Sequence, residues 1–138
     1  MIPTYANGTP IGIGDWARVF VPHLGVWHHG IVRRIYWFGT GMAVEIAHNQ
    51  KGFGVIASDW YDFADGQTIF LHRRPAPGQV QMILARLESN MGGSYDLFAK
   101  NCEHFASYVF TGRAVSNQVA AVGFIAAVAI ILGLWGLE

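Results

Sequence analysis

The feature that most constrains this chain is an apolar segment near its C-terminal end, residues 119–137. Its 19 residues carry no charge and no polar stripe, so no face of the segment favours water. As a helix it spans about 28 Å, close to the thickness of bilayer hydrocarbon. A domain of about a hundred residues is poorly able to bury such a helix on every side, which leaves the bilayer or, as an alternative, the groove of a partner protein. The sequence therefore predicts one folded domain at residues 1–117, followed by a transmembrane helix at residues 118–138.

The residues around this segment predict its orientation. Arg113 is the last basic residue before it and none follows, which places the folded domain on the cytoplasmic side of a single-pass, C-terminal anchor. Residues 1–9 lack the basic start and apolar run of a secretory signal. Gly123 and Ala127 form a small-xxx-small pair that would let two such helices associate into a homo-oligomer.

Composition excludes several classes of function. Nine basic and nine acidic side chains give a formal net charge of zero, so we expect no nucleic-acid partner. A single cysteine allows neither an internal disulfide nor a thiolate zinc site. None of the six histidines forms a pair at the helical spacing of a zinc motif, so no metal is expected.

Hydrophobic periodicity predicts an α+β fold in which a small antiparallel sheet is followed by helices. Alternating and β-branched runs separated by glycine and proline indicate strands, and an apolar repeat of helical period precedes the paired glycines at 92–93. The expected strands are residues 16–21, 26–35, 42–48, 53–57 and 68–72; the expected helical segments are residues 58–63, 78–91 and 102–111.

The only cysteine lies at the expected start of the last helix. Asn101 is a good N-cap and Gly112 a good C′ residue, so Cys102 becomes the first helical residue. Unpaired backbone N–H groups at this position lower the pKa of a thiol and stabilise an oxyanion on an attacked carbonyl. The alternative is a buried structural cysteine.

Two histidines favour the reactive interpretation. His28 and His48 lie on strands joined through a turn at residues 39–41, an even number of positions apart. With a connecting loop of odd length, both side chains fall on one face of the ribbon. Cys102 as nucleophile, His28 as base and His48 as the orienting imidazole would then form a thiol triad. His29 points to the opposite face.

These residues resemble a known family. The string HHGIV at residues 28–32, the later His48 and the string NCEHF at residues 101–105 are similar to motifs of the lecithin:retinol acyltransferase family, which includes phospholipase A/acyltransferases. The resemblance implies a circularly permuted papain-like, NlpC-type fold with the histidine strands before the cysteine helix. It also implies that His28 is the base, that His29 takes an aromatic position, and that His48 is the second histidine.

The sequence departs from the family in its hairpin. Residues 33–38 (RRIYWF) replace a short glycine–aspartate turn. This longer connection leaves Asn49 and Gln50 as alternatives to His48 for orienting the base. The family motif also contains Asn101, Glu103 and His104, to which we assign support of the oxyanion site and of the helix start rather than direct chemistry.

Three functions compete at this stage. The first is a membrane-anchored phospholipase A/acyltransferase that cleaves glycerophospholipid esters through a thioester, with the anchor at residues 119–137 holding the site at the bilayer. The second is a thiol amidase or peptidase of the wider superfamily. The third is a non-catalytic module for membrane remodelling or partner binding. None of them requires a metal or organic cofactor.

Overall fold

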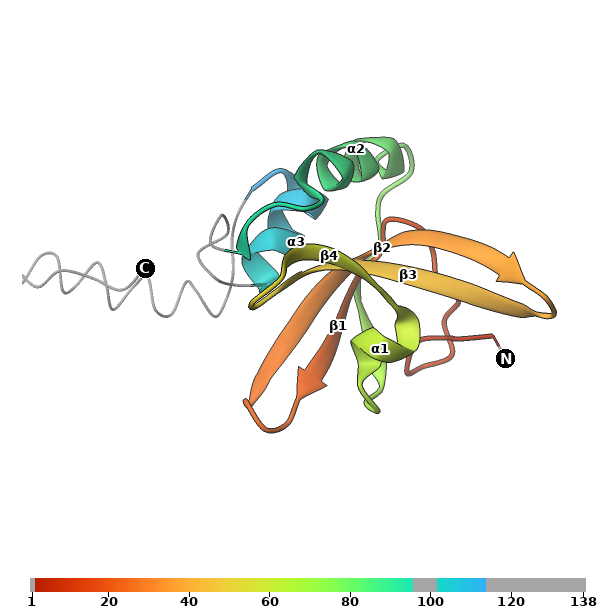
Figure 1. Cartoon of the computed structure of the whole chain (residues 1–138). Helices are drawn as coiled ribbons and strands as arrows, with labels where there is room; N and C mark the ends of the chain where they lie inside the picture. The colour runs from red at the N-terminus through yellow and green to blue at the C-terminus, as the bar shows by residue number, and fades with distance from the viewer. Residues whose placement is uncertain (1, 96–101, 114–138) are drawn as a thin grey trace, which may run out of the picture.

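The computed structural model describes residues 2–95 and 102–113. Within these residues, five strands form one antiparallel sheet in the order β4-β3-β2-β1-β5 (Figure 1). The α+β arrangement predicted from the sequence is therefore confirmed. The elements in chain order are β1 (Trp16–Val21), β2 (Val26–Phe38), β3 (Gly41–Gln50), β4 (Gly54–Asp59), α1 (Trp60–Ala64), β5 (Ile69–Arg73), α2 (Val80–Asn90) and α3 (Cys102–Thr111).

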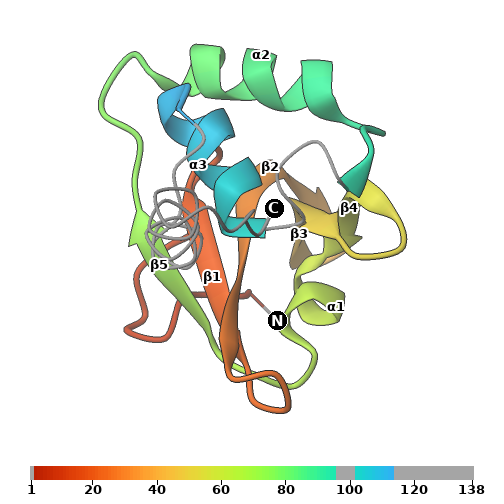
Figure 2. The same cartoon turned by 90° about the vertical axis from the view of Figure 1, so that its left-hand side faces the viewer.

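Helices cover the two faces of the sheet unequally. Figures 1 and 2 show α2 and α3 on one face and the short α1 on the other. Because strand side chains alternate between faces, each face has its own apolar core. The core beneath α3 includes Trp16, Ile31, Ala47, Ile83, Leu87, Phe105 and Val109. The core on the α1 side includes Tyr5, Val19, Val32, Val44, Ile46, Trp60 and Phe63.

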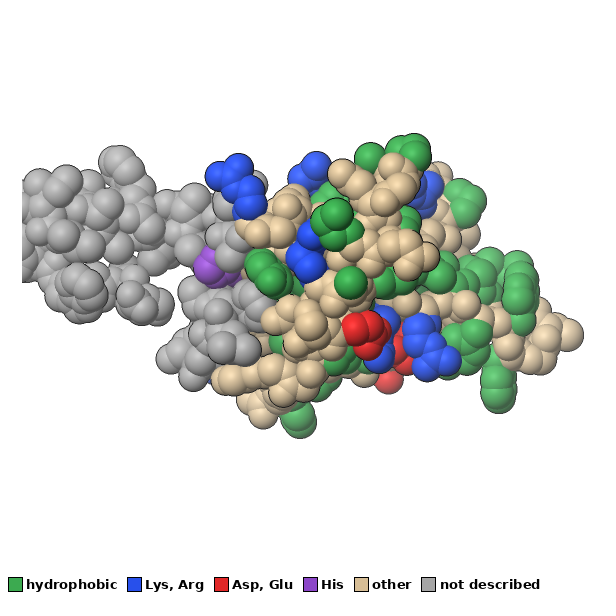
Figure 3. Space-filling model, turned by 90° about the horizontal axis from the view of Figure 1, so that it is seen from above, with side chains coloured by type: hydrophobic (Ala, Val, Ile, Leu, Met, Phe, Trp, Pro, Cys, Tyr) green, Lys and Arg blue, Asp and Glu red, His purple; other side chains and the backbone are tan. Residues whose placement is uncertain are grey.

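The strand pattern was predicted closely at β1 and less closely in the hairpin that follows. The predicted strand at residues 16–21 is confirmed, whereas β2 continues three residues beyond the predicted end at residue 35, as far as Phe38. The outer half of this hairpin projects from the body of the protein (Figure 1), and hydrophobic side chains gather at its end (Figure 3). Trp37 and Phe38 there are 66% and 78% exposed. Exposed residues give no burial pattern, so the sequence could not mark the end of the strand.

A β-bulge sets the register between β2 and β3. Phe38 pairs with Gly41 across a two-residue loop, not across the odd-length loop expected from the sequence. The register then shifts by one residue between Val32 and Arg34, so that His48 pairs with Gly30. Without this bulge His48 would pair with Ile31 and face α3, because a slip of one residue moves every side chain to the other face.

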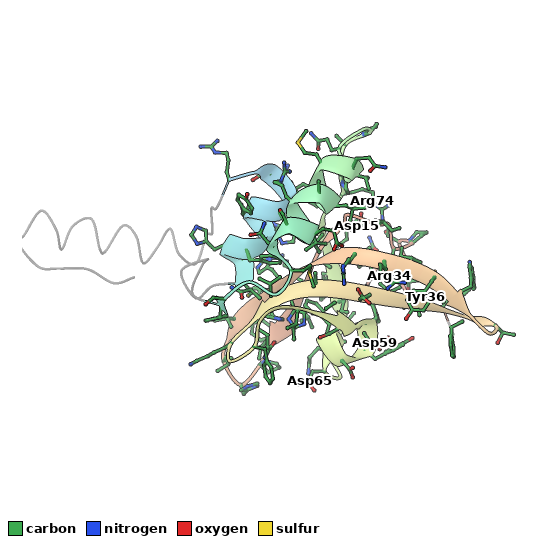
Figure 4. The ribbon with its side chains drawn as sticks, turned by 45° about the horizontal axis from the view of Figure 1, so that its top comes forward. Asp15, Arg34, Tyr36, Asp59, Asp65 and Arg74 are labelled. Atoms are coloured by element: carbon green, nitrogen blue, oxygen red, sulfur yellow. The ribbon has the colours of Figure 1, made fainter. Side chains whose placement is uncertain are left out.

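The segment before β1 is tied to the sheet by a buried carboxylate. Asp15, only 1% exposed, accepts a hydrogen bond from the Tyr5 hydroxyl at 2.8 Å and forms an ion pair with Arg74 at 2.9 Å (Figure 4). Burying a carboxylate is favourable only where such partners compensate its lost hydration. Asp15 therefore joins the N-terminal segment, the start of β1 and the end of β5.

The predicted membrane anchor and the domain boundary at residues 117–118 lie outside the described residues. Among the residues that the structure describes, no helix is long and apolar enough to cross a membrane. The described helices instead pack on the sheet through their buried faces.

Candidate active site

Cys102 is the first residue of α3 and lies against the backbone of β2. Phe105 and Val109, on the same side of the helix, are fully buried and hold it on the sheet. The backbone N–H of His29 donates to the Cys102 sulfur at 3.4 Å, and the thiol donates to the carbonyl oxygen of Trp27 at 3.6 Å. The sulfur thus contacts the chain on both sides of His28.

The environment of this thiol differs from the sequence expectation. Burial raises the pKa of the Cys102 thiol to about 11. The N–H groups of His29, Cys102 and Glu103 act in the predicted direction and lower it, but by less than burial raises it. The lowering effect expected from the helix start is therefore present but is outweighed by burial. The sulfur carries its proton at neutral pH, and a base has to remove that proton during reaction.

His28 begins a chain of side-chain hydrogen bonds on the α1 side of the sheet. Its Nε2 lies 2.8 Å from Nδ1 of His48, and Nε2 of His48 lies 2.8 Å from the Ser58 hydroxyl oxygen. The Phe63 ring is 5.2 Å from both imidazoles, between centroids. A Cβ on Gly30 would collide with Ile46 and press on the Phe63 ring, so the glycine of the HHGIV string makes room for this packing.

Both imidazoles of this chain are uncharged at neutral pH. Burial lowers the pKa of His28 to about 4, and burial together with repulsion from His28 lowers that of His48 to about 3. Because Nε2 of His28 is engaged with His48, Nδ1 is the ring nitrogen left to exchange a proton. The chain suits a neutral imidazole that accepts a proton and is stabilised once charged.

His29 occupies a different environment although it is the next residue. Trp16 Nε1–H donates to Nδ1 of His29 at 2.8 Å, so a neutral His29 carries its own proton on Nε2. Its ring also lies 5.7 Å from that of His72, between centroids. Burial lowers the pKa of His29 to about 4, and the nearby Glu103 carboxylate opposes this shift. Its side chain faces α3, as strand alternation predicts.

The remaining predicted residues take several places. Asn101 lies outside the described residues. Glu103 is buried, and its charge raises the pKa of both His29 and His72 against larger opposing effects. His104 is half-buried on α3. Asn49, an alternative orienting residue, donates instead to the Tyr95 carbonyl oxygen at 3.0 Å.

A comparison with protein families matches this architecture. The family model described as lecithin retinol acyltransferase matches residues 12–115, more than half of the chain. The chain belongs to this family. The matched range runs from before β1 to just after α3, so it includes every strand and helix described above. A comparison with curated proteins finds no significant match. In the described part of the chain, no group of His, Cys, Asp or Glu is arranged to hold a metal ion.

The sequence did not indicate a functional role for two further residues, Ser58 and Arg18. Ser58, interpreted from the sequence only as the start of a helical turn, ends the histidine chain. Its position two residues from Ile56, the β4 partner of His48, would identify it only once the register is known. Arg18 pairs with His29 across β1 and β2, and nothing in the sequence distinguishes it from other strand arginines.

Proposed function

We propose that this protein is a cysteine-dependent phospholipase A/acyltransferase that cleaves glycerophospholipid esters through a thioester on Cys102. One observation carries the proposal: the Cys102 sulfur contacts the backbone on both sides of His28, whose imidazole begins the chain through His48 to Ser58. A half-buried thiol held against the backbone that flanks a neutral imidazole, itself held by an orienting partner, suits nucleophilic acyl transfer.

The first step moves one proton and exchanges one bond. Nδ1 of His28 takes the thiol proton as the sulfur attacks the ester carbonyl, and the tetrahedral oxyanion then expels the alcohol, which takes the proton back. In this step Nε2–H of His28 donates to Nδ1 of His48, and Nε2–H of His48 donates to the Ser58 hydroxyl. These two hydrogen bonds disperse the charge on His28 and fix its tautomer.

The start of α3 supplies the oxyanion site in this mechanism. The N–H groups of Cys102 and Glu103 already favour negative charge on the sulfur. The same donors suit the oxyanion of the tetrahedral intermediate, which lies two bonds from the sulfur. Asn101 and His104 flank these donors in the family motif and support the helix start. Water, an amine or a lysolipid then takes the acyl group from the sulfur.

The proposal also includes a membrane anchor, which lies outside the described residues, and a relation of the fold to the papain-like enzymes. Residues 119–137 form a single membrane-spanning anchor, with the catalytic domain on the cytoplasmic side and Gly123 and Ala127 at a helix–helix contact. The strands before the cysteine helix correspond to a permuted papain-like fold. Both features are supported by the apolar length of the segment and by the order of the elements.

Intact-protein mass spectrometry tests the chemistry directly. Full-length protein in a maltoside detergent is mixed with phosphatidylcholine, beside Cys102→Ala as the control. We expect a mass increase of one fatty acyl group that hydroxylamine removes and that Cys102→Ala lacks. An unmodified cysteine, with no fatty acid released over a long incubation, would contradict the lipid function. Acylation by an amide or peptide substrate instead would establish the amidase alternative.

A further inference from the structure

Three aromatic side chains form an exposed surface at the end of the sheet nearest Cys102. The Phe20 and Trp27 rings lie 5.3 Å apart, and the Trp27 and Phe70 rings lie 5.7 Å apart, between centroids. The register places all three on the α3 face, since Phe20 pairs with Trp27 and Phe70 pairs with Arg18. Phe20 is 37% and Phe70 42% exposed. We call Phe20, Trp27 and Phe70 the aromatic platform.

Arg18 lies on this platform. Its guanidinium carbon is 4.3 Å from the centroid of the Trp27 ring. Its Nε is buried, and no hydrogen-bond acceptor lies within reach of that atom among the described residues. The ion pairs of the described residues involve Arg33, Arg34 and Arg74, but not Arg18. Arg18 is thus a half-buried cation with no direct ion pair to a carboxylate among the described residues.

The platform adjoins the nucleophile. The Trp27 carbonyl oxygen accepts from the Cys102 thiol, and Arg18 pairs across the strands with His29, whose N–H contacts the same sulfur. The buried Glu103 carboxylate acts on His29 and His72 from the α3 side, and the Arg18 charge acts on the same two rings. The Arg18 charge and the aromatic platform therefore lie beside Trp27 and His29, the two residues whose backbone contacts the sulfur.

We propose that Arg18 binds the phosphate of a glycerophospholipid while the aromatic platform contacts its glycerol and acyl part. The proposal rests on the proposed function, because it positions an ester for Cys102. A guanidinium offers a planar fork of N–H donors that matches phosphate, and its weak hydration suits a half-buried site. The amphipathic Trp27 indole suits the boundary between headgroup and hydrocarbon, and the Phe20 and Phe70 rings suit the apolar part of the lipid. A free phosphate would use the arginine but not the rings.

Binding measurements with a non-reactive protein test this assignment. Full-length Cys102→Ala in a maltoside detergent is titrated with dihexanoylphosphatidylcholine, with dihexanoylglycerol and with inorganic phosphate. We expect Arg18→Gln to weaken phosphatidylcholine binding about tenfold or more, the effect of one charge-assisted contact. Diacylglycerol binding should stay within about twofold, because it lacks the phosphate. Arg18→Lys should restore part of the loss, since the charge returns without the fork.

Arg34→Gln is the matched control. Arg34 is also a strand cation over an aromatic ring, 5.3 Å from the Tyr36 centroid, but it lies opposite Glu45 of β3 on the projecting half of the hairpin (Figure 4). We expect this variant to bind all three ligands as the parent does. Phe70→Ala should weaken phosphatidylcholine and diacylglycerol together, because the platform serves the part that both lipids share.

Several outcomes would overturn the assignment. If Arg18→Gln binds phosphatidylcholine as the parent does, Arg18 takes no part in binding. If the variant loses both lipids equally, Arg18 is a structural residue. Inorganic phosphate binding as tightly as the lipid would exclude the platform from recognition. Acylation of Cys102 tests the proposed function separately. Binding that depends on Arg18 without acylation would support the phosphate site and contradict the catalytic proposal. Acylation with binding that does not depend on Arg18 would support catalysis and contradict the phosphate site.

Discussion

His28 and His29 are adjacent in one strand, yet they face different halves of the molecule. His28 points toward α1, where its Nε2 meets His48 and the chain continues to Ser58. His29 points toward α3, where Nδ1 is engaged by Trp16 and the ring packs beside His72. Burial lowers the pKa of both to about 4.

The two residues differ in their partners, although burial lowers the pKa of both to a similar value. The charge that His28 would gain is dispersed through a second imidazole and a hydroxyl, and its Nδ1 remains for proton exchange. His29 has its acceptor nitrogen occupied by an indole N–H and contributes to the site mainly through its backbone, which contacts the sulfur. Equal pKa values therefore do not imply equal roles.

The sharpest test of this comparison substitutes each histidine by glutamine. We expect His28→Gln to lower kcat/KM for release of fatty acid from phosphatidylcholine by about 10²- to 10⁴-fold, the usual contribution of a general base. His29→Gln should stay within about tenfold of the parent, because its N–H to the sulfur is retained. Equal losses in the two variants would contradict the different roles of the two histidines. A larger loss for His29→Gln would indicate that the base lies on the α3 face.

The protonation state of Cys102 offers a second test. Since burial raises the pKa of the thiol to about 11, the thiolate fraction grows about tenfold per pH unit up to that value. The rate of alkylation by iodoacetamide, followed by mass spectrometry without substrate, should rise accordingly between pH 7 and 10. His28→Gln should show the same slope. A rate that is flat above pH 6 in the parent would instead indicate a preformed thiolate–imidazolium pair.

The free energy of unfolding should depend on pH through the histidines on both faces of the sheet. The folded-state pKa of His28, His29 and His48 lies below the unfolded value of about 6.5, so the unfolded chain binds more protons as the pH falls. Their contribution is fully present above pH 7 and is lost from about pH 6.5 toward pH 4, by up to about 1.4 kcal/mol per pH unit for each histidine. Thermal unfolding across this range measures it. His29→Gln should reduce the slope without abolishing it, and an unchanged slope would contradict the neutral state of His29.

The smallest expected effects separate the partners of the two histidines. Ser58→Ala should lower kcat about fivefold, equivalent to one neutral hydrogen bond of about 1 kcal/mol, with little change in Tm. Trp16→Phe should show the opposite pattern: a loss of about 1–2 kcal/mol in the free energy of unfolding, measured in urea, with kcat within about twofold. If Trp16→Phe lowered kcat more than Ser58→Ala did, the α3 face would take part in the chemistry.

Much of this protein was accessible from local patterns. The strand at residues 16–21, the start of α3 at Cys102 and the left-handed glycine after it, Gly112 with φ 81°, all follow from periodicity and capping. The NCEHF and HHGIV strings pointed to the family that the comparison then showed. Arg18 and Ser58 could not be found in this way, because their significance depends on which residue lies opposite them in the sheet.

The sequence by itself determined that His28 and His29 face opposite sides, since alternation along a strand is a local property of the backbone. The capping pattern likewise predicts that Cys102 begins a helix, as the structure shows. Only the tertiary structure decided which side His48 joins. The bulge between Val32 and Arg34 shifts β3 by one residue and puts His48 beside His28, and the Arg33 side chain within it is held by Glu45 and Glu88 from β3 and α2. Register depends on contacts between segments far apart in the chain, and so does the pKa of a thiol buried against a strand 73 residues before it.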